Sequence, residues 1–73
     1  MAIVSADAVQ AALDPTFRNM RILRVFQVSS TVDEFFVSGG VAPYAGKNRW
    51  VRATNTNTAS QQATTITNAM AAD

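Results

Sequence analysis

The sequence contains neither cysteine nor histidine. Without these residues the chain cannot form a disulfide framework or a zinc site built from cysteine and histidine. The missing histidine also removes the most common acid–base side chain, together with the Ser/His and Cys/His nucleophile pairs. We therefore expect no enzyme activity, and we predict no catalytic residue, no metal ligand and no cofactor.

Charged residues are scarce as well. They make up 15% of the 73 residues, against roughly 25% in an ordinary soluble domain. The net charge is +1 and the pI is about 8.3, below the value of about 9 that is typical of nucleic-acid-binding domains. All six basic residues lie between residues 15 and 52, and the stretch from Ala53 to Ala72 carries no charge.

Long hydrophobic segments are missing too. Residues 1–13 hold no basic residue and only short aliphatic stretches, so we expect no secretion signal. The uncharged tail approaches the length of a membrane span, but its Thr, Asn and Gln side chains would be too costly to bury in lipid. We therefore expect no membrane partner.

Bulky hydrophobic residues are few for a chain that must fold. Hydrophobic residues make up 48% of the sequence, but thirteen of them are alanine. A single domain of this size, spanning residues 1–73, buries only about 60% of the surface that its unfolded chain exposes. Because disulfides and metal are excluded, other protein subunits or copies of the chain itself are the expected source of further burial.

The N-terminal segment is typical of a short helix. Ser5 is a candidate N-cap, and Asp7 then falls in the first turn, where the helix dipole favours a carboxylate. The predicted helix runs to Leu13. Asp14-Pro15 is predicted to end this helix or to begin another short turn.

Three segments have the composition of strands: Arg21–Ser29, Val32–Ser38 and Lys47–Thr54. The first is apolar on both faces, which indicates a central strand or one covered by a second layer. The third has no cleanly apolar face and is predicted to be an edge strand. The adjacent Phe35 and Phe36 must point to opposite faces of the sheet, so one fits a single-sided core and the other needs a partner surface.

The C-terminal segment carries a helix signature. Thr58-x-x-Gln61 fits the capping box, and the residues after Thr58 include a thin stripe at helical spacing: Ala59, Ala63, Ile66 and Met70. We predict a helix that docks by this stripe, with a polar linker or arm over residues 55–73 as the alternative. The order α-β-β-β-α predicts an α+β fold, in which two helices flank a small antiparallel three-stranded sheet.

Two segments resemble a catalytic site or a phosphate site but lack residues or geometry that such a site requires. Asp33 and Glu34 are adjacent, but on a strand they face opposite ways and cannot act on one substrate atom, so we interpret them as a solvated strand start. Residues 40–47 superficially resemble a phosphate loop. That pattern requires glycine where Val41 stands and Ser or Thr where Asn48 stands, so we interpret the segment as a hairpin loop.

Basic and aromatic residues are interleaved around the third strand: Tyr44, Lys47, Arg49, Trp50 and Arg52. Trp50 could stack on a base while the cations contact phosphates, as in single-strand binders. Strand alternation, however, places Lys47 and Arg49 on one face, with Trp50 and Arg52 on the other. Trp50 packed on one of the two phenylalanines, with arginines pairing to acids of a neighbouring subunit, is the competing interpretation.

The composition of the whole chain resembles that of a known class. The features are the tail TNTNTASQQATTITNAMAAD (Thr54–Asp73), the loop VAPYAG (Val41–Gly46) and strands that are apolar on both faces. In these the chain resembles the small structural proteins of tailed-bacteriophage particles, such as capsid cement or decoration proteins and head or tail accessory subunits. The resemblance carries over no functional residue.

This resemblance implies a virion protein, made in the host cytoplasm, that binds the major capsid protein or neighbouring virion proteins across subunit boundaries. A small nucleic-acid-binding module is the alternative. Aromatic residues and arginine are the usual anchors of protein interfaces. The expected contacts are Phe35, Phe36, Tyr44, Arg49, Trp50, Arg52, Ala59, Ala63, Ile66 and Met70.

Overall fold

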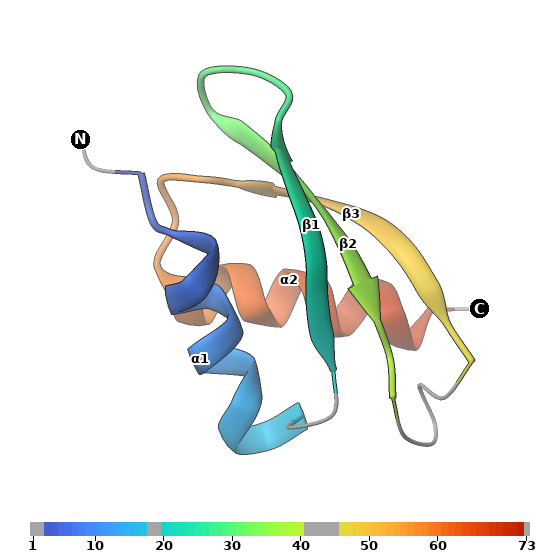
Figure 1. The fold of residues 1–73 in the computed structure, drawn as a ribbon. Helices are drawn as coiled ribbons and strands as arrows, with labels where there is room; N and C mark the ends of the chain where they lie inside the picture. The colour runs from blue at the N-terminus through green and yellow to red at the C-terminus, as the bar shows by residue number, and fades with distance from the viewer. Residues whose placement is uncertain (1–2, 18–19, 41–45, 73) are drawn as a thin grey trace.

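The computed structural model describes residues 3–17, 20–40 and 46–72. Its elements are α1 (Ala6–Phe17), β1 (Arg21–Gln27), β2 (Val32–Ser38), β3 (Asn48–Thr54) and α2 (Ala59–Ala71). The predicted α-β-β-β-α order is therefore confirmed, and the three strands form one antiparallel sheet in the order β1-β2-β3. Figure 1 shows both helices on the same side of this sheet.

The core lies between the helices and one face of the sheet. Strand alternation places Phe35 and Val37 of β2 on this face, where both are fully buried. The stripe on α2 is buried in the same core, α2 packs against β3 and α1, and α1 also packs against β1. The buried hydrophobic residues are Val9, Leu13, Met20, Phe35, Val37, Val51, Ala53, Ala63, Ile66 and Met70. The helix predicted in the C-terminal segment is thus present as α2, and it docks on this chain's own sheet.

β1 corrects one prediction from the sequence. Its apolar residues on both faces indicated a central or covered strand, but β1 is an edge strand, and six of its seven residues are exposed. A break in the pairing with β2 between Ile22 and Arg24 shifts the register. This bulge changes which side chains share a face, so Val25 pairs with Phe35 on the core side and Phe26 pairs with Glu34 on the other.

α1 begins as predicted and extends further than predicted. The Ser5 hydroxyl accepts a hydrogen bond from the Ala8 N–H at 3.2 Å, which is the geometry of an N-cap. The helix continues through Pro15 to Phe17. Proline costs a helix the hydrogen bond from its own position. Because Pro15 lies in the last turn, that loss falls where the helix is already ending.

A glutamine fastens α1 to the start of β1. The Gln10 amide donates to the Met20 carbonyl at 2.9 Å and accepts from the Ile22 N–H at 2.7 Å. One side chain therefore satisfies both a donor and an acceptor of the strand backbone. This pair of bonds fixes where β1 begins relative to the helix.

The capping box of α2 supports a stability prediction. Thr58 accepts from the Gln61 N–H at 3.1 Å, and the Gln61 side chain accepts from the Thr58 N–H at 3.0 Å. Thr58→Ala should lower the free energy of unfolding by about 1 kcal/mol, measured by urea denaturation followed by circular dichroism. Thr64→Ala is the matched control on the same helix, because its exposed hydroxyl bonds only to the Ser60 carbonyl. Equal losses in the two variants would contradict the capping role.

Candidate functional site

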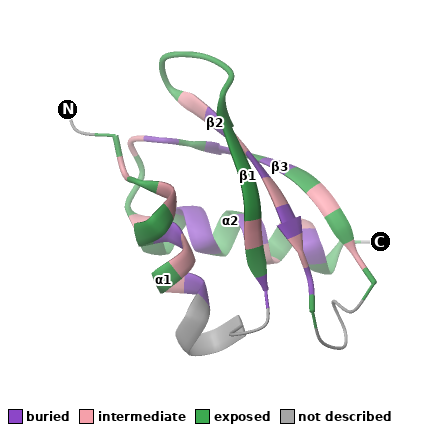
Figure 2. Ribbon diagram, viewed as in Figure 1, coloured by how far each residue is buried: buried purple, intermediate pink, exposed green. Residues whose placement is uncertain are grey.

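No element of the described residues covers the sheet face opposite the helices, and we call it the open face. Its residues are the even-numbered positions of β2, of β3 and of β1 after the bulge, among them Arg24, Phe26, Glu34, Phe36, Trp50 and Arg52. In Figure 2 buried residues, in purple, alternate with pink and green ones along β2 and β3, as expected of strands that bury one face. Any partner of the sheet would meet these side chains first.

Three aromatic rings gather on the open face, and we call them the aromatic patch. Trp50 pairs directly with Phe36, and their ring centroids are 4.9 Å apart. The indole also reaches Phe26 at 5.6 Å, so it lies across the central strand. Phe26 and Trp50 nevertheless remain 51% and 48% exposed. The patch is therefore held by ring–ring contacts in the free chain and still presents a large apolar surface.

Charged side chains border the aromatic patch. Arg52 Nε lies 3.2 Å from Glu34 Oε2, and the Arg52 side chain is well exposed. An exposed pair of this kind contributes roughly 0–1 kcal/mol to stability. Arg24 pairs with Phe36 and is exposed beside the rings. The open face thus has an apolar centre with charges at its rim.

The structure separates the two phenylalanines as the sequence required. Phe36 belongs to the aromatic patch, and the interpretation that Trp50 packs on one of the phenylalanines is confirmed for this residue. Phe35 is fully buried in the core of the chain itself. Our expectation that Phe35 contacts another subunit is corrected accordingly.

The stripe on α2 needs the same correction. Ala63, Ile66 and Met70 are buried, and Ala59 is partly buried against the same core. They were expected to contact other subunits, but this chain's own sheet and α1 supply their burial. Tyr44, another expected contact, lies outside the described residues.

The basic residues split between two tasks. Arg49 donates to the carbonyls of Ala69, at 2.8 Å, and of Ala72, while the Lys47 ammonium donates to the Met70 carbonyl at 3.2 Å. These carbonyls belong to the C-terminal turn of α2, where cations offset the helix dipole and satisfy acceptors. Arg49, also an expected interface residue, therefore acts within the chain, and of Lys47, Arg49 and Arg52 it is Arg52 that lies on the open face with Trp50.

A buried polar junction was missed by the sequence analysis. Asn55 is fully buried; its backbone N–H donates to the Thr31 carbonyl at 2.9 Å, and its carbonyl accepts from the Val4 N–H at 3.0 Å. The Asn55 amide also donates to Asp33 Oδ1 at 3.2 Å. Asp33 is only 8% exposed, which corrects its interpretation as part of a solvated strand start.

Gln62 completes this junction from α2. It is fully buried, and its amide donates to the carbonyls of Asn55 at 3.4 Å and Asn57 at 2.9 Å. Its helical spacing, three residues after Ala59 and four before Ile66, was the signal that could have revealed it. The side-chain oxygens of Asn55 and Gln62 receive no hydrogen bond within the described chain. The hydrogen bonds that the two side chains make in the junction are therefore those donated by their amide nitrogens.

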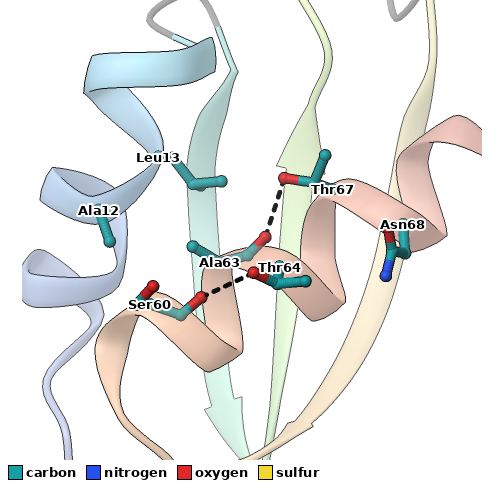
Figure 3. A pocket seen from close by; sticks show the side chains of 7 residues that line it. All are labelled: Ala12, Leu13, Ser60, Ala63, Thr64, Thr67 and Asn68. Atoms are coloured by element: carbon teal, nitrogen blue, oxygen red, sulfur yellow. Dashed lines mark hydrogen bonds between the residues drawn. The ribbon is translucent and has the colours of Figure 1, made fainter.

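One open pocket of about 230 Å³ lies between α1 and α2 (Figure 3). It is lined by Ala12, Leu13, Ser60, Ala63, Thr64, Thr67 and Asn68. Two of its hydroxyls turn back to their own helix, because Thr64 donates to the Ser60 carbonyl and Thr67 to the Ala63 carbonyl. The lining holds no titratable side chain, so it offers no group for acid–base chemistry.

Among the described residues, no three Asp, Glu, His or Cys side chains are grouped so that they could hold a metal ion. Within the same residues, no helix has the length and apolar character that crossing a membrane requires. Comparison with protein-family models, curated proteins and solved structures gives no match. Function is therefore inferred from the chemistry of the open face.

The assignment of Arg49 to α2 can be tested by stability. Arg49→Ala should lower the free energy of unfolding by about 1–2 kcal/mol, because it removes charged donors from helix carbonyls. Arg24→Ala, which removes an exposed arginine from the open face, should change it by less than about 0.5 kcal/mol. Both values come from urea denaturation. A loss for Arg24→Ala as large as that for Arg49→Ala would contradict the separation of roles.

Proposed function

We propose that this chain is a non-enzymatic structural subunit of a virion, of the capsid cement or accessory class. It stabilises the particle by docking the open face of its sheet across a boundary between other protein subunits. The observation that carries this proposal is the aromatic patch, in which Phe26 and Trp50 are about half exposed.

The energetics of the patch favour a protein partner. Completely burying a large apolar side chain is worth roughly 1.5–3 kcal/mol relative to leaving it exposed. Tryptophan is one of the residue types that commonly contribute most of the binding energy of an interface. Such residues contribute most where polar groups around them exclude water. Arg24, Arg52 and Glu34 surround the rings in this way.

The outer surface of α2 suits a crowded assembly. The hydroxyls of Thr64, Thr65 and Thr67 each donate to the carbonyl four residues earlier, at 2.9–3.1 Å. Side chains satisfied in this way leave no donor unpaired when a neighbour covers them. Because α2 also carries no charged residue, it can be buried without the cost of an unpaired charge.

A nucleic-acid-binding module remains the second candidate, because the open face places Arg24 and Arg52 beside three aromatic rings. Bases stack on such rings in single-strand binders. Three observations weaken it. The rings already contact one another, Arg52 is engaged by Glu34, and Arg49 is bound to the end of α2.

The structural role can be tested by sedimentation of particles from the source of the protein. Wild-type chain should co-sediment with megadalton particles. Trp50→Ala should reduce the bound fraction at least tenfold, because it removes the centre of the aromatic patch. Thr65→Ala, on the exposed surface of α2, is the control and should stay bound. Recovery of the wild-type chain only in the low-mass fraction would contradict the proposal.

The second candidate can be tested with the single tryptophan of the chain. Stacking on a base would quench Trp50 fluorescence when single-stranded DNA is titrated at low salt. We expect no saturable quenching, because the rim of the open face carries a low net charge. Saturable quenching would instead establish nucleic-acid binding if the affinity for DNA falls as the salt concentration rises. Arg24→Ala would then reduce the slope with which the affinity depends on salt.

A further inference from the structure

The two edges of the sheet differ in chemistry. β1 exposes a run of large apolar side chains: Leu23 at 57%, Val25 at 42%, Phe26 at 51% and, just beyond the strand, Val28 at 44%. The arginines of β1, Arg21 and Arg24, leave residues 25–28 without charge, whereas Arg49 and Arg52 are spread along β3. Charges on an edge strand discourage pairing with other strands. Figure 2 shows β1 largely green along its length. β1 is therefore the edge that is suited to accept another strand.

The backbone groups on the outer edge of β1 follow from the ladder. The Val28 N–H donates to the Val32 carbonyl at 2.9 Å, which makes this pair a hydrogen-bonded one. Antiparallel ladders alternate such pairs, so Arg24 and Phe26 direct their N–H and C=O groups to β2. Val25 and Gln27 direct theirs outward, and no hydrogen bond between them and another element is found in the described chain.

The start of the same edge is closed. The Gln10 side chain occupies the Met20 carbonyl and the Ile22 N–H, and the bulge between Ile22 and Arg24 interrupts the ladder. A regular free edge therefore spans residues 24–28 only. Phe26 is the midpoint of that edge.

We propose that two copies of this chain pair through β1, antiparallel and with a two-fold axis at Phe26, to form one six-stranded sheet. Val25 and Gln27 of each copy then exchange backbone hydrogen bonds with Gln27 and Val25 of the other. Phe26 lies opposite the second copy's Phe26 in a non-hydrogen-bonded pair, where side chains approach most closely.

Charge and the bulge each disfavour one other register. With the axis at Phe26, Arg24 lies opposite the second copy's Val28, and the two arginines are kept apart. An axis at Arg24 would place two like charges directly opposite each other, which is destabilising. An axis at Val25 would bring Leu23, which lies at the bulge, into the ladder. A second copy is thus a self-complementary partner for this edge.

The dimer does not depend on the virion role, and it is tested on the isolated chain. Sedimentation equilibrium should show a reversible, concentration-dependent mass of twice the 7.8 kDa of one chain. A monomeric mass up to millimolar concentration would overturn the proposal and would leave the edge to a strand from a different protein.

The register can be tested with cysteines, because the chain contains none. Arg24→Cys and Val28→Cys lie opposite each other across the proposed axis, so a mixture of the two variants should form a mixed disulfide under mild oxidation. Each variant alone should cross-link at least tenfold less. Asn48→Cys on β3 is the control for random collision. Both Arg24 and Val28 are exposed, and circular dichroism checks that the variants stay folded.

Two cross-linking results would overturn the two-fold pairing at Phe26. One is a mixed disulfide yield no higher than that of the Asn48→Cys control. The other is a strong disulfide in Arg24→Cys alone, which would place the axis at Arg24. Phe26→Cys alone should cross-link to itself, which gives an independent check of the axis.

Discussion

The fold depends on the packing of one thin helix stripe against one face of a three-stranded sheet. Ile66 and Met70 of α2 are fully buried with Phe35 of β2, and the smaller Ala63 is buried in the same core. Two short helices rich in alanine can cover only one face of such a sheet. Phe36, one residue after Phe35, is therefore left on the other side, and the open face is a direct consequence of this one-sided core.

α2 carries no charged residue that could offset its own dipole, so both of its ends are stabilised by hydrogen bonds. The capping box closes its first turn, and Arg49, reaching from β3, closes its last. Gln62 joins the first turns to the Asn55 junction, which also receives the N-terminal segment through Val4. Alternate positions of β3 thus serve both faces of the sheet, because Arg49 contacts α2 while Trp50 and Arg52 lie on the open face.

Sequence periodicity predicted the elements, the caps and the division between Phe35 and Phe36, because these depend on local spacing. It failed where the outcome depends on what covers a surface. The apolar residues of β1 indicated burial, but alternation cannot say which faces the helices reach, and the bulge after Ile22 changed the faces themselves. Asn55 is a further example, because a single asparagine after a strand gives no local sign that three segments converge on its backbone and amide.

Phe26 belongs both to the aromatic patch and to the free edge of β1, and this overlap links the two proposed surfaces. If two copies pair at Phe26, the open faces join, and the two patches lie beside each other on either side of the axis. A dimer would then present two identical docking sites in a fixed geometry. When a rigid pair of sites matches the spacing of its targets, the second contact forms at a high effective concentration, and the overall affinity exceeds that of one site without any new contact. In this way a small, weakly charged structural subunit could stabilise a large assembly. The affinity of the dimer would come from the fixed spacing of its two sites and not from the area that one chain buries.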